Sequence, residues 1–268
     1  MTIDFEKSNQ ALEIISSINL DSVDANKRIS YLIKNRLIVP YILTSIPKGF
    51  YLYRARENQN GQEFTKRDQI SYNKNKSKIN PGRVNRKGQS IFYASHKWET
   101  PLFETSSLIK NGIKNGKEVF TIGRWLVKDS FLLFVLISRL TFLDEHAEIL
   151  SKYKSFLQNA SEFNNPDAIN HLQFFCDQFA RSVKWNNNLY KISSSYFNHI
   201  ITNTKEKVFG MLYPTVEYDY NDLNVALLPE AVEKYLVLDM VVKYELIIKD
   251  GEGDYRLMEI LDIDSFNK

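Results

Sequence analysis

The spacing of apolar residues at the start of the chain predicts two helices followed by a strand. Within residues 1–45, apolar side chains recur every three or four positions in the runs ALEIISSI and RISYLIKNRLI, as they do on one face of a helix. Pro40 should end or kink the second helix, because proline lacks the backbone N–H that a helix interior needs. After the turn PKG at 47–49, the aromatic-rich run FYLYRAR at 50–56 predicts a strand.

A long polar stretch separates this strand from the next. Residues 57–81 are rich in Asn and Lys, so we expect a long loop, and loops of that length in compact domains are often functional. SIFYAS at 90–95 predicts a second short strand. Side chains alternate along a strand, so Ile91, Tyr93 and Ser95 should share one of its faces.

A helix and further extended segments follow. Thr100 and Pro101 predict a helix start, with threonine as the N-cap and proline at the first helical position, and the helix should run to about Gly112. EVFTIGRWLV at 118–127 predicts a third strand. FLLFVLI at 131–137 fits either another strand or the start of a helix.

The second half of the chain is first helical and then extended. Residues 143–206 predict a mainly helical block, in which Pro166 opens a helix with apolar residues at helical spacing. The tail predicts strands in the runs VFGMLYPTV, LVLDMVVKYELIIKD and YRLMEIL. This order favours an α+β fold over a doubly wound parallel sheet. We expect an N-terminal helical region at 1–46 and a main domain at 47–268, with a helical insertion at about 143–206.

Composition adds limits on class and compartment. The 268 residues are 43% hydrophobic and 25% charged, which suits a folded chain with a sizeable core. Cys176 is the only cysteine, which excludes a disulfide within the chain and suits a reducing cytosol. The N-terminus is polar, and the longest apolar run is far shorter than the ~20 residues of a membrane helix. We therefore expect a cytoplasmic protein with no membrane partner.

Charge and histidine spacing restrict the kinds of ligand. The formal net charge of +3 is too small to imply a nucleic-acid binder, although basic residues crowd between 66 and 88. The aromatic residues in or beside that stretch, Phe64 and Tyr72, are few for a base-stacking platform. The four histidines show no metal-ligand spacing, so we expect no metal.

Three residues between 82 and 104 combine into a candidate site. Arg83 lies on a turn between two glycines, where a guanidinium suits a diphosphate or a carboxylate. Tyr93 lies in the middle of the predicted strand 90–95, where its ring could stack on a planar base. Glu104 lies one position beyond the capping-box position of the predicted helix, so capping does not explain it.

The spacings of Arg83, Tyr93 and Glu104, with the glycine turn before the strand, resemble those of the RES domain family. Further runs carry the resemblance: YRAR at 53–56, GRVN and FYAS around the central motif, and GMLYPTVEYDYNDLNVALLPE at 210–230. The family is named for its Arg, Glu and Ser motifs, and its members look like diphtheria-toxin-type ADP-ribosyltransferases. The resemblance implies an ADP-ribosyltransferase-like core with a mixed or antiparallel sheet. It covers about residues 48–128 and 187–240.

The resemblance also implies that NAD is the substrate and that no cofactor is required. Known members are toxins that degrade NAD, usually beside a DNA-binding antitoxin. Glu104 would then stabilise positive charge that develops on the ribose, with Tyr93 walling the pocket and Arg83 holding the diphosphate or a ribose. Further substrate-binding candidates are Arg54, Arg56, Thr215 and Asn224.

Two departures from the family pattern stand out. Thr215 occupies the position where the family commonly has serine, which keeps a hydroxyl but adds a methyl group. The chain is also longer than the compact toxins, so its regulation need not follow a toxin–antitoxin pair. A cognate antitoxin or other regulatory protein, a second copy of the chain and a role in phage defence all stay open.

Three alternatives compete with NAD breakdown. The same fold could transfer ADP-ribose to a protein or nucleic acid, although Leu102 stands where such transferases often carry a second Glu or Gln. The basic loop 66–88 could belong to a nucleic-acid-binding module. The chain could also be a catalytically inactive interaction domain.

Overall fold

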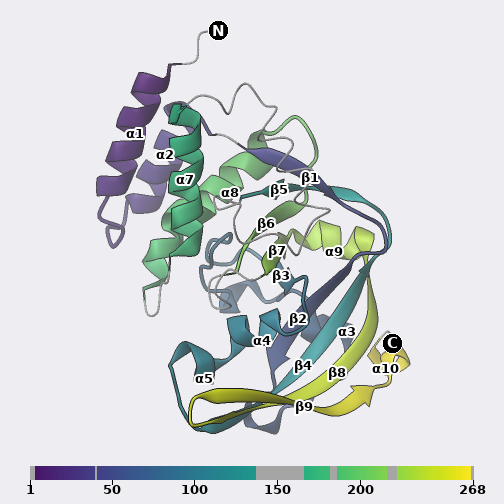
Figure 1. The fold of residues 1–268 in the computed structure, drawn as a ribbon. Coiled ribbons are helices and arrows are strands. Elements are labelled where there is room, and N and C mark those ends of the chain that lie inside the picture. Colours follow the sequence, from purple (N-terminus) through teal and green to yellow (C-terminus); the bar gives the residue numbers. More distant parts are fainter. Residues whose placement is uncertain (1–3, 40, 137–165, 182–185, 216–221, 267–268) are drawn as a thin grey trace. The chain divides into compact units, whose positions relative to one another are not determined.

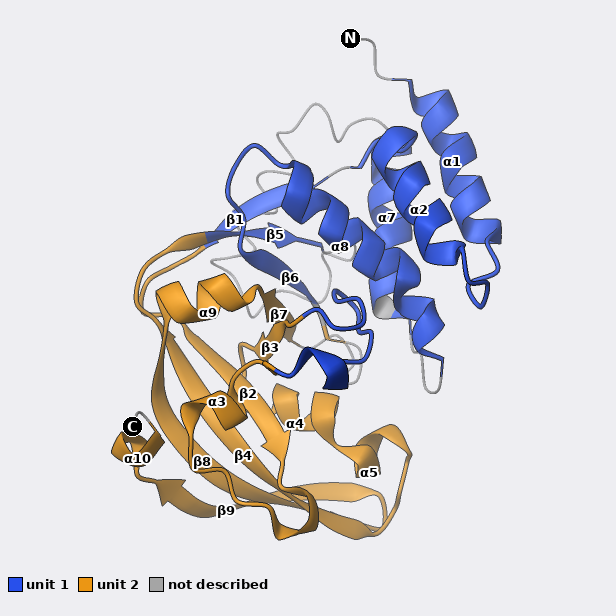
Figure 2. Cartoon of the chain, turned by 180° about the vertical axis from the view of Figure 1, so that it is seen from behind, with its two compact units in different colours: residues 1–45, 75–89, 132–213 blue, residues 46–74, 90–131, 214–268 orange. Residues whose placement is uncertain are grey.

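The chain forms two compact units, coloured separately in Figure 2. The computed structural model describes residues 4–39, 41–136, 166–181, 186–215 and 222–266. Unit 1 comprises residues 1–45, 75–89 and 132–213, and unit 2 comprises residues 46–74, 90–131 and 214–268. Helices and both parallel and antiparallel strand pairs occur among the described residues, which confirms the predicted α+β class with mixed pairing.

Unit 2 is built on an antiparallel sheet with the strand order β7-β3-β2-β4-β8-β9 (Figure 1). Its strands are β2 (Tyr51–Glu57), β3 (Phe92–Ser95), β4 (Gly116–Val127), β7 (Leu223–Leu227), β8 (Leu236–Lys249) and β9 (Glu252–Leu261). Apolar side chains from β2, β4, β8 and helix α4 (Thr100–Thr105) form one core cluster, including Ala55, Leu102, Phe120 and Leu246. Burying such side chains contributes roughly 1.5–3 kcal/mol each.

Short helices complete unit 2. They are η1 (Gln59–Gly61), α3 (Arg67–Ile70), α4, α5 (Ser107–Lys110), α9 (Pro229–Tyr235) and α10 (Ile263–Phe266). Strand β7 and helix α9 were missed by the sequence patterns. All five residues of β7 are buried, so that strand lacks the alternation of polar and apolar positions that marks a half-exposed strand.

The predicted helix from Thr100 to about Gly112 is wrong in two details. It breaks at Ser106, and the position before its first turn is Glu99 rather than Thr100. The buried carboxylate of Glu118 on β4 accepts hydrogen bonds from Ser106 Oγ at 2.5 Å and from the backbone N of Ser107 at 3.0 Å. A carboxylate at that point caps a new helix start, so α5 begins afresh after the break.

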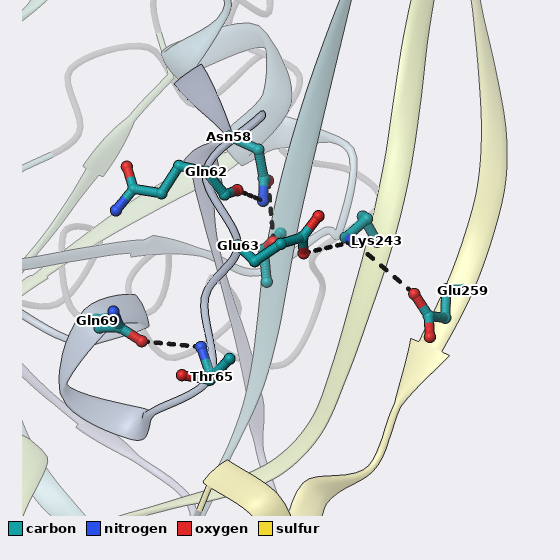
Figure 3. A network of polar contacts seen from close by, with 8 residues as sticks. Asn58, Gln62, Glu63, Thr65, Gln69, Lys243 and Glu259 are labelled. Atoms are coloured by element: carbon teal, nitrogen blue, oxygen red, sulfur yellow. Dashed lines mark hydrogen bonds and ion pairs between the residues drawn. The ribbon is translucent and has the colours of Figure 1, made fainter. Parts of the chain in front are cut away.

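The predicted loop 57–81 contains short helical turns and is pinned to the sheet at its start (Figure 3). Buried Asn58 accepts a hydrogen bond from Thr121 Oγ1 at 2.9 Å and donates one to the backbone oxygen of Gln62 at 2.7 Å. Lys243 on β8 donates to Glu63 Oε2 at 2.6 Å. These bonds hold the loop start against β4 and β8.

Unit 1 is mainly helical. Helices α1 (Phe5–Ser17), α2 (Ala25–Asn35), α7 (Pro166–Ala180) and α8 (Lys191–Asn203) pack on one another, and η2 (Lys76–Lys78) and η5 (Asn187–Tyr190) are single turns. Phe175, Phe179 and Tyr196 are fully buried, with the rings of Phe175 and Tyr196 stacked at 4.1 Å between centroids. The periodicity that predicted α1, α2 and α7 is confirmed.

Three strands belong to unit 1: β1 (Ile42–Ile46), β5 (Phe131–Val135) and β6 (Gly210–Pro214), adjacent in that order. Strands β5 and β6 run parallel. The structure therefore shows Phe131–Val135 of the run FLLFVLI as a strand, whereas β1 was missed in a region predicted to be helical. The parts of the predicted helical block at 143–165 and of the C-terminal motif at 216–221 lie outside the described residues.

Candidate functional site

Glu104 lies near the end of α4 in unit 2, with its side chain half-buried. Its Oε1 accepts a hydrogen bond from Nδ2 of Asn224 at 2.9 Å. A hydrogen bond between an amide and an ionised carboxylate is among the stronger polar contacts in proteins, worth about 1.5–3 kcal/mol. The bond fixes the direction of the carboxylate of this partly buried residue.

Asn224 is itself held by Ser95. The two residues lie directly opposite each other on β7 and β3, and Ser95 Oγ donates to Asn224 Oδ1 at 2.7 Å. Ser95 is 2% exposed and Asn224 is 6% exposed. Because serine supplies the proton to the amide oxygen, the amide NH₂ group is left to face Glu104. Ser95, Asn224 and Glu104 thus form one relay of oriented side chains.

Asp222 fastens the segment before β7 to the start of α4. Its buried carboxylate accepts hydrogen bonds from the backbone N of Lys97 at 3.0 Å and from Thr100 Oγ1 at 2.5 Å. Its backbone oxygen accepts a hydrogen bond from the N of Thr215 at 3.0 Å. Asp222 therefore sets the geometry between the helix that carries Glu104 and the strand that carries Asn224.

Tyr93 lies on the same face of β3 as Ser95, two residues away. The alternation of side chains along a strand gives this placement, and the pairing of Tyr93 with Ala226 and of Ser95 with Asn224 keeps both strands in register. The tyrosine is half-buried. The structure therefore brings Tyr93, Asn224 and Glu104 to one face of the unit 2 sheet.

Arg54 and Arg56 project from the other face. Tyr53 lies opposite Ser95, so Arg54 and Arg56 on β2 point away from the Glu104 side. The Arg54 guanidinium donates to the backbone oxygens of Tyr93 at 2.6 Å and of Ser71 at 3.2 Å, and Arg56 donates to the same Ser71 oxygen at 3.2 Å.

These two arginines are desolvated cations. Burial lowers the pKa of Arg54 to about 9, and the charge of Arg56 adds to the effect; burial also lowers the pKa of Arg56. Within the described parts of the chain, no carboxylate forms an ion pair with either side chain, and Arg56 Nε is buried without a hydrogen-bond partner. Partly buried positive charge without an ion-pair partner favours a bound anion.

Arg83 belongs to unit 1 and is buried there. Its Nη1 donates to the backbone oxygens of Phe179 and Arg181, the latter at 2.9 Å, and its guanidinium lies over the ring of Tyr190 at 5.6 Å from the centroid. Positive charge at the carbonyl end of a helix is favourable, so Arg83 stabilises the end of α7. Gly88, at the end of the turn that carries Arg83, has a φ of 77°, a conformation that suits glycine.

Thr215 is fully buried in unit 2. Its backbone bonds to Asp222, whereas its Oγ1 has no hydrogen-bond partner within the structure. A buried hydroxyl without a hydrogen bond lowers the stability of the fold by roughly 1–3 kcal/mol, so a polar ligand group that bonds to Thr215 would recover that free energy.

Sequence reasoning did not assign a site role to Ser95 or Asp222. The sequence did contain a signal for Ser95, because strand alternation places its side chain on the same face as that of Tyr93, the candidate site residue two positions before it. For Asp222 the only signal in the sequence is its position two residues before Asn224. That position does not indicate that Asp222 bonds to the start of α4.

Several basic side chains of the stretch 66–88 are engaged within their own unit. Arg67 donates to Glu233 at 3.1 Å, Lys74 to Asp68 at 2.7 Å, and Arg86 to Ser30 Oγ at 3.1 Å. Together with the buried Arg83, these contacts reduce the positive charge that the stretch can offer to a polyanion.

No cluster of three His, Cys, Asp or Glu side chains suited to a metal occurs in the described part of the chain. None of its described helices is both long and apolar enough to span a membrane. Neither models of known protein families nor curated proteins match the sequence.

Proposed function

We propose that this chain is a RES-type enzyme with an ADP-ribosyltransferase-like core that degrades NAD by cleaving the bond between nicotinamide and ribose. The observation that carries the proposal is the relay Ser95–Asn224–Glu104. In it, a buried amide orients the carboxylate of the partly buried Glu104, on the sheet face that also carries Tyr93. The spacing of Arg83, Tyr93 and Glu104 along the chain supports it independently.

The chemistry needs little more than such a carboxylate. The nicotinamide ring of NAD is already cationic, so its departure needs no general acid. As the bond between ribose C1′ and the ring nitrogen breaks, its electron pair leaves with nicotinamide and positive charge grows on the ribose, as in glycoside cleavage. A fixed carboxylate stabilises that charge more in the transition state than in the substrate, which is the condition for catalysis.

The remaining candidate residues differ in how well they fit the proposal. Tyr93 lines the ribose and nicotinamide pocket, Asn224 orients Glu104, and Thr215 is a candidate to bond the substrate, because its hydroxyl has no hydrogen-bond partner among the described residues. Arg54 and Arg56 point to the sheet face opposite Glu104, and Arg83 bonds to the end of α7 in unit 1, so the proposal assigns these three arginines no contact with a substrate at Glu104. Water or phosphate attacks C1′, and the proton lost by water passes to solvent.

Depletion of NAD would make the protein a toxin or an abortive-infection effector of the bacterial cytoplasm. Its partners would be NAD and a protein that restrains it, such as an antitoxin.

The test measures nicotinamide release from NAD by purified protein, with and without phosphate. We expect release by the wild type and at least ~100-fold slower release by Glu104→Gln, the scale of losing one transition-state-stabilising group. Glu63→Gln is the matched control, because Glu63 is an exposed carboxylate of the same unit that pairs with Lys243. NAD left intact by the wild type across pH and phosphate conditions, or equal rates for wild type and Glu104→Gln, would refute the proposal.

The products separate the acceptors. Free ADP-ribose indicates water and a phosphorylated ADP-ribose indicates phosphate. Label retained on protein or nucleic acid indicates transfer instead of breakdown.

A further inference from the structure

Strand β9 forms one edge of the unit 2 sheet. It pairs with β8 from Val241–Leu261 to Lys249–Glu252, and no other described strand borders it (Figure 1). Every second residue of an edge strand points its backbone N–H and C=O away from the sheet, which makes the edge a template for another strand.

This edge lacks two of the usual protections against pairing, because β9 is ten residues long and contains no proline. It does carry charged side chains and an irregular register beside Tyr244, so a partner strand has to match its charge. Its apolar side chains are unusually open: Leu257 is 48% exposed, Met258 is 50% exposed and Ile260 is 64% exposed. Apolar side chains gathered in this way on a surface are typical of a protein contact.

The charges around β9 define the chemistry of the strand that fits. Between residues 252 and 264 the chain carries five carboxylates and one arginine. Glu259 lies 3.8 Å from Lys243, whereas the other four form no ion pair with any described residue. These four exposed carboxylates are Glu252, Asp254, Asp262 and Asp264.

A second copy of the chain fits this edge poorly. Pairing β9 with itself would bring together two strands that each carry an excess of carboxylates, and like charges close to one another destabilise a strand pair. A strand with lysine or arginine beside apolar residues has the complementary charge and can cover the exposed side chains.

We infer that the outer edge of β9 docks an extended, basic and apolar segment of another protein, which adds a strand to the unit 2 sheet. Backbone hydrogen bonds supply affinity in this mode of recognition, and side chains supply selectivity. The inference does not depend on NAD cleavage, since it uses no residue of the Ser95–Asn224–Glu104 relay.

The experiment uses a synthetic decapeptide of alternating valine and lysine, and a second one of alternating valine and glutamate. Hydrogen–deuterium exchange of the full chain is followed by mass spectrometry with each peptide. We expect the lysine peptide to slow exchange in residues 252–261 and to bind at least tenfold more tightly than the glutamate peptide at low salt. Raising the salt concentration should reduce that difference, because exposed charges are screened.

Variants locate the contact. Ile260→Lys should weaken binding of the lysine peptide at least tenfold, whereas Val237→Lys, the same change at an exposed apolar position of β8, should leave it unchanged. Three results would overturn the inference. They are an absence of slowed exchange in 252–261, equal binding of both peptides, and a concentration-dependent dimer of the chain that protects β9 without peptide.

Discussion

Replacing Asn224 by aspartate tests the relay most directly. The two side chains have almost the same shape, so Asn224→Asp changes a hydrogen-bond donor 2.9 Å from Glu104 Oε1 into an acceptor while leaving the packing intact. Two carboxylates then face each other beside buried Ser95. At neutral pH the variant must either keep both charges or take up one proton.

The cost follows from simple electrostatics. Two unit charges about 3 Å apart repel by roughly 5 kcal/mol at an effective dielectric constant of about 20. Taking up a proton costs about 1.4 kcal/mol per pH unit above a carboxyl pKa near 4, which is about 4 kcal/mol at pH 7. Because Glu104 is half-buried and can turn toward solvent, we expect a loss of about 2–3 kcal/mol at pH 7 and under ~1 kcal/mol at pH 4.

The direction in which the stability of Asn224→Asp changes with pH depends on whether the folded or the unfolded chain binds the extra proton. The folded variant keeps a shared proton that the unfolded chain has lost above about pH 4, so its stability relative to wild type falls as the pH rises from 4 to 7. Thermal unfolding at a series of pH values measures this. The expected difference in melting temperature at pH 7 is roughly 5–10 °C.

The double variant Glu104→Gln/Asn224→Asp is the matched control. It exchanges the two groups, so an amide again donates to a carboxylate, and the stability lost at pH 7 should largely return. NAD cleavage should not return, because the carboxylate has moved to β7. A stability difference that does not change with pH, or a double variant no more stable than Asn224→Asp, would refute the relay as described.

Two further predictions concern unit 1. Arg83→Gln should lower the free energy of unfolding by about 2 kcal/mol in chemical denaturation, because the charged donor to the Phe179 carbonyl is lost at the end of α7; unchanged stability with lost NAD cleavage would assign Arg83 to the substrate instead. Burial lowers the pKa of His171 and of His199, so the folded chain resists protons that the unfolded chain accepts below about pH 6.5. Stability should therefore fall as the pH drops through 6.5, and His171→Gln should flatten that fall; equal slopes for wild type and variant in acid titrations of the melting temperature would contradict it.

The sequence by itself determined the local elements. Periodicity placed α1, α2 and α7, and apolar runs bounded by turn residues placed β2, β3 and β4, because both patterns depend only on neighbours along the chain. The patterns failed where distant residues intervene. Glu118 breaks the helix after Glu104 from a separate strand, and the fully buried β7 has no alternation to detect.

For the candidate site, too, the sequence determined some features and the tertiary structure determined others. The resemblance of the spacings to the RES family selected Tyr93 and Glu104, and alternation put Tyr93 on the face of Ser95. Only the tertiary structure decided that Asn224, 120 residues from Glu104, orients its carboxylate. That contact depends on β7 pairing with β3.

The pairing of β2 with β3 decided the sheet face to which Arg54 points. Arg54 and Tyr93 are joined by a hydrogen bond yet project from opposite faces of the sheet, because Tyr53 rather than Arg54 lies opposite Ser95. The sequence of a strand shows which of its own side chains share a face. Which of its side chains lie on the same face as a residue of another strand is set by the register between the two strands. Register is a property of the folded sheet, so no local pattern in the sequence could supply it.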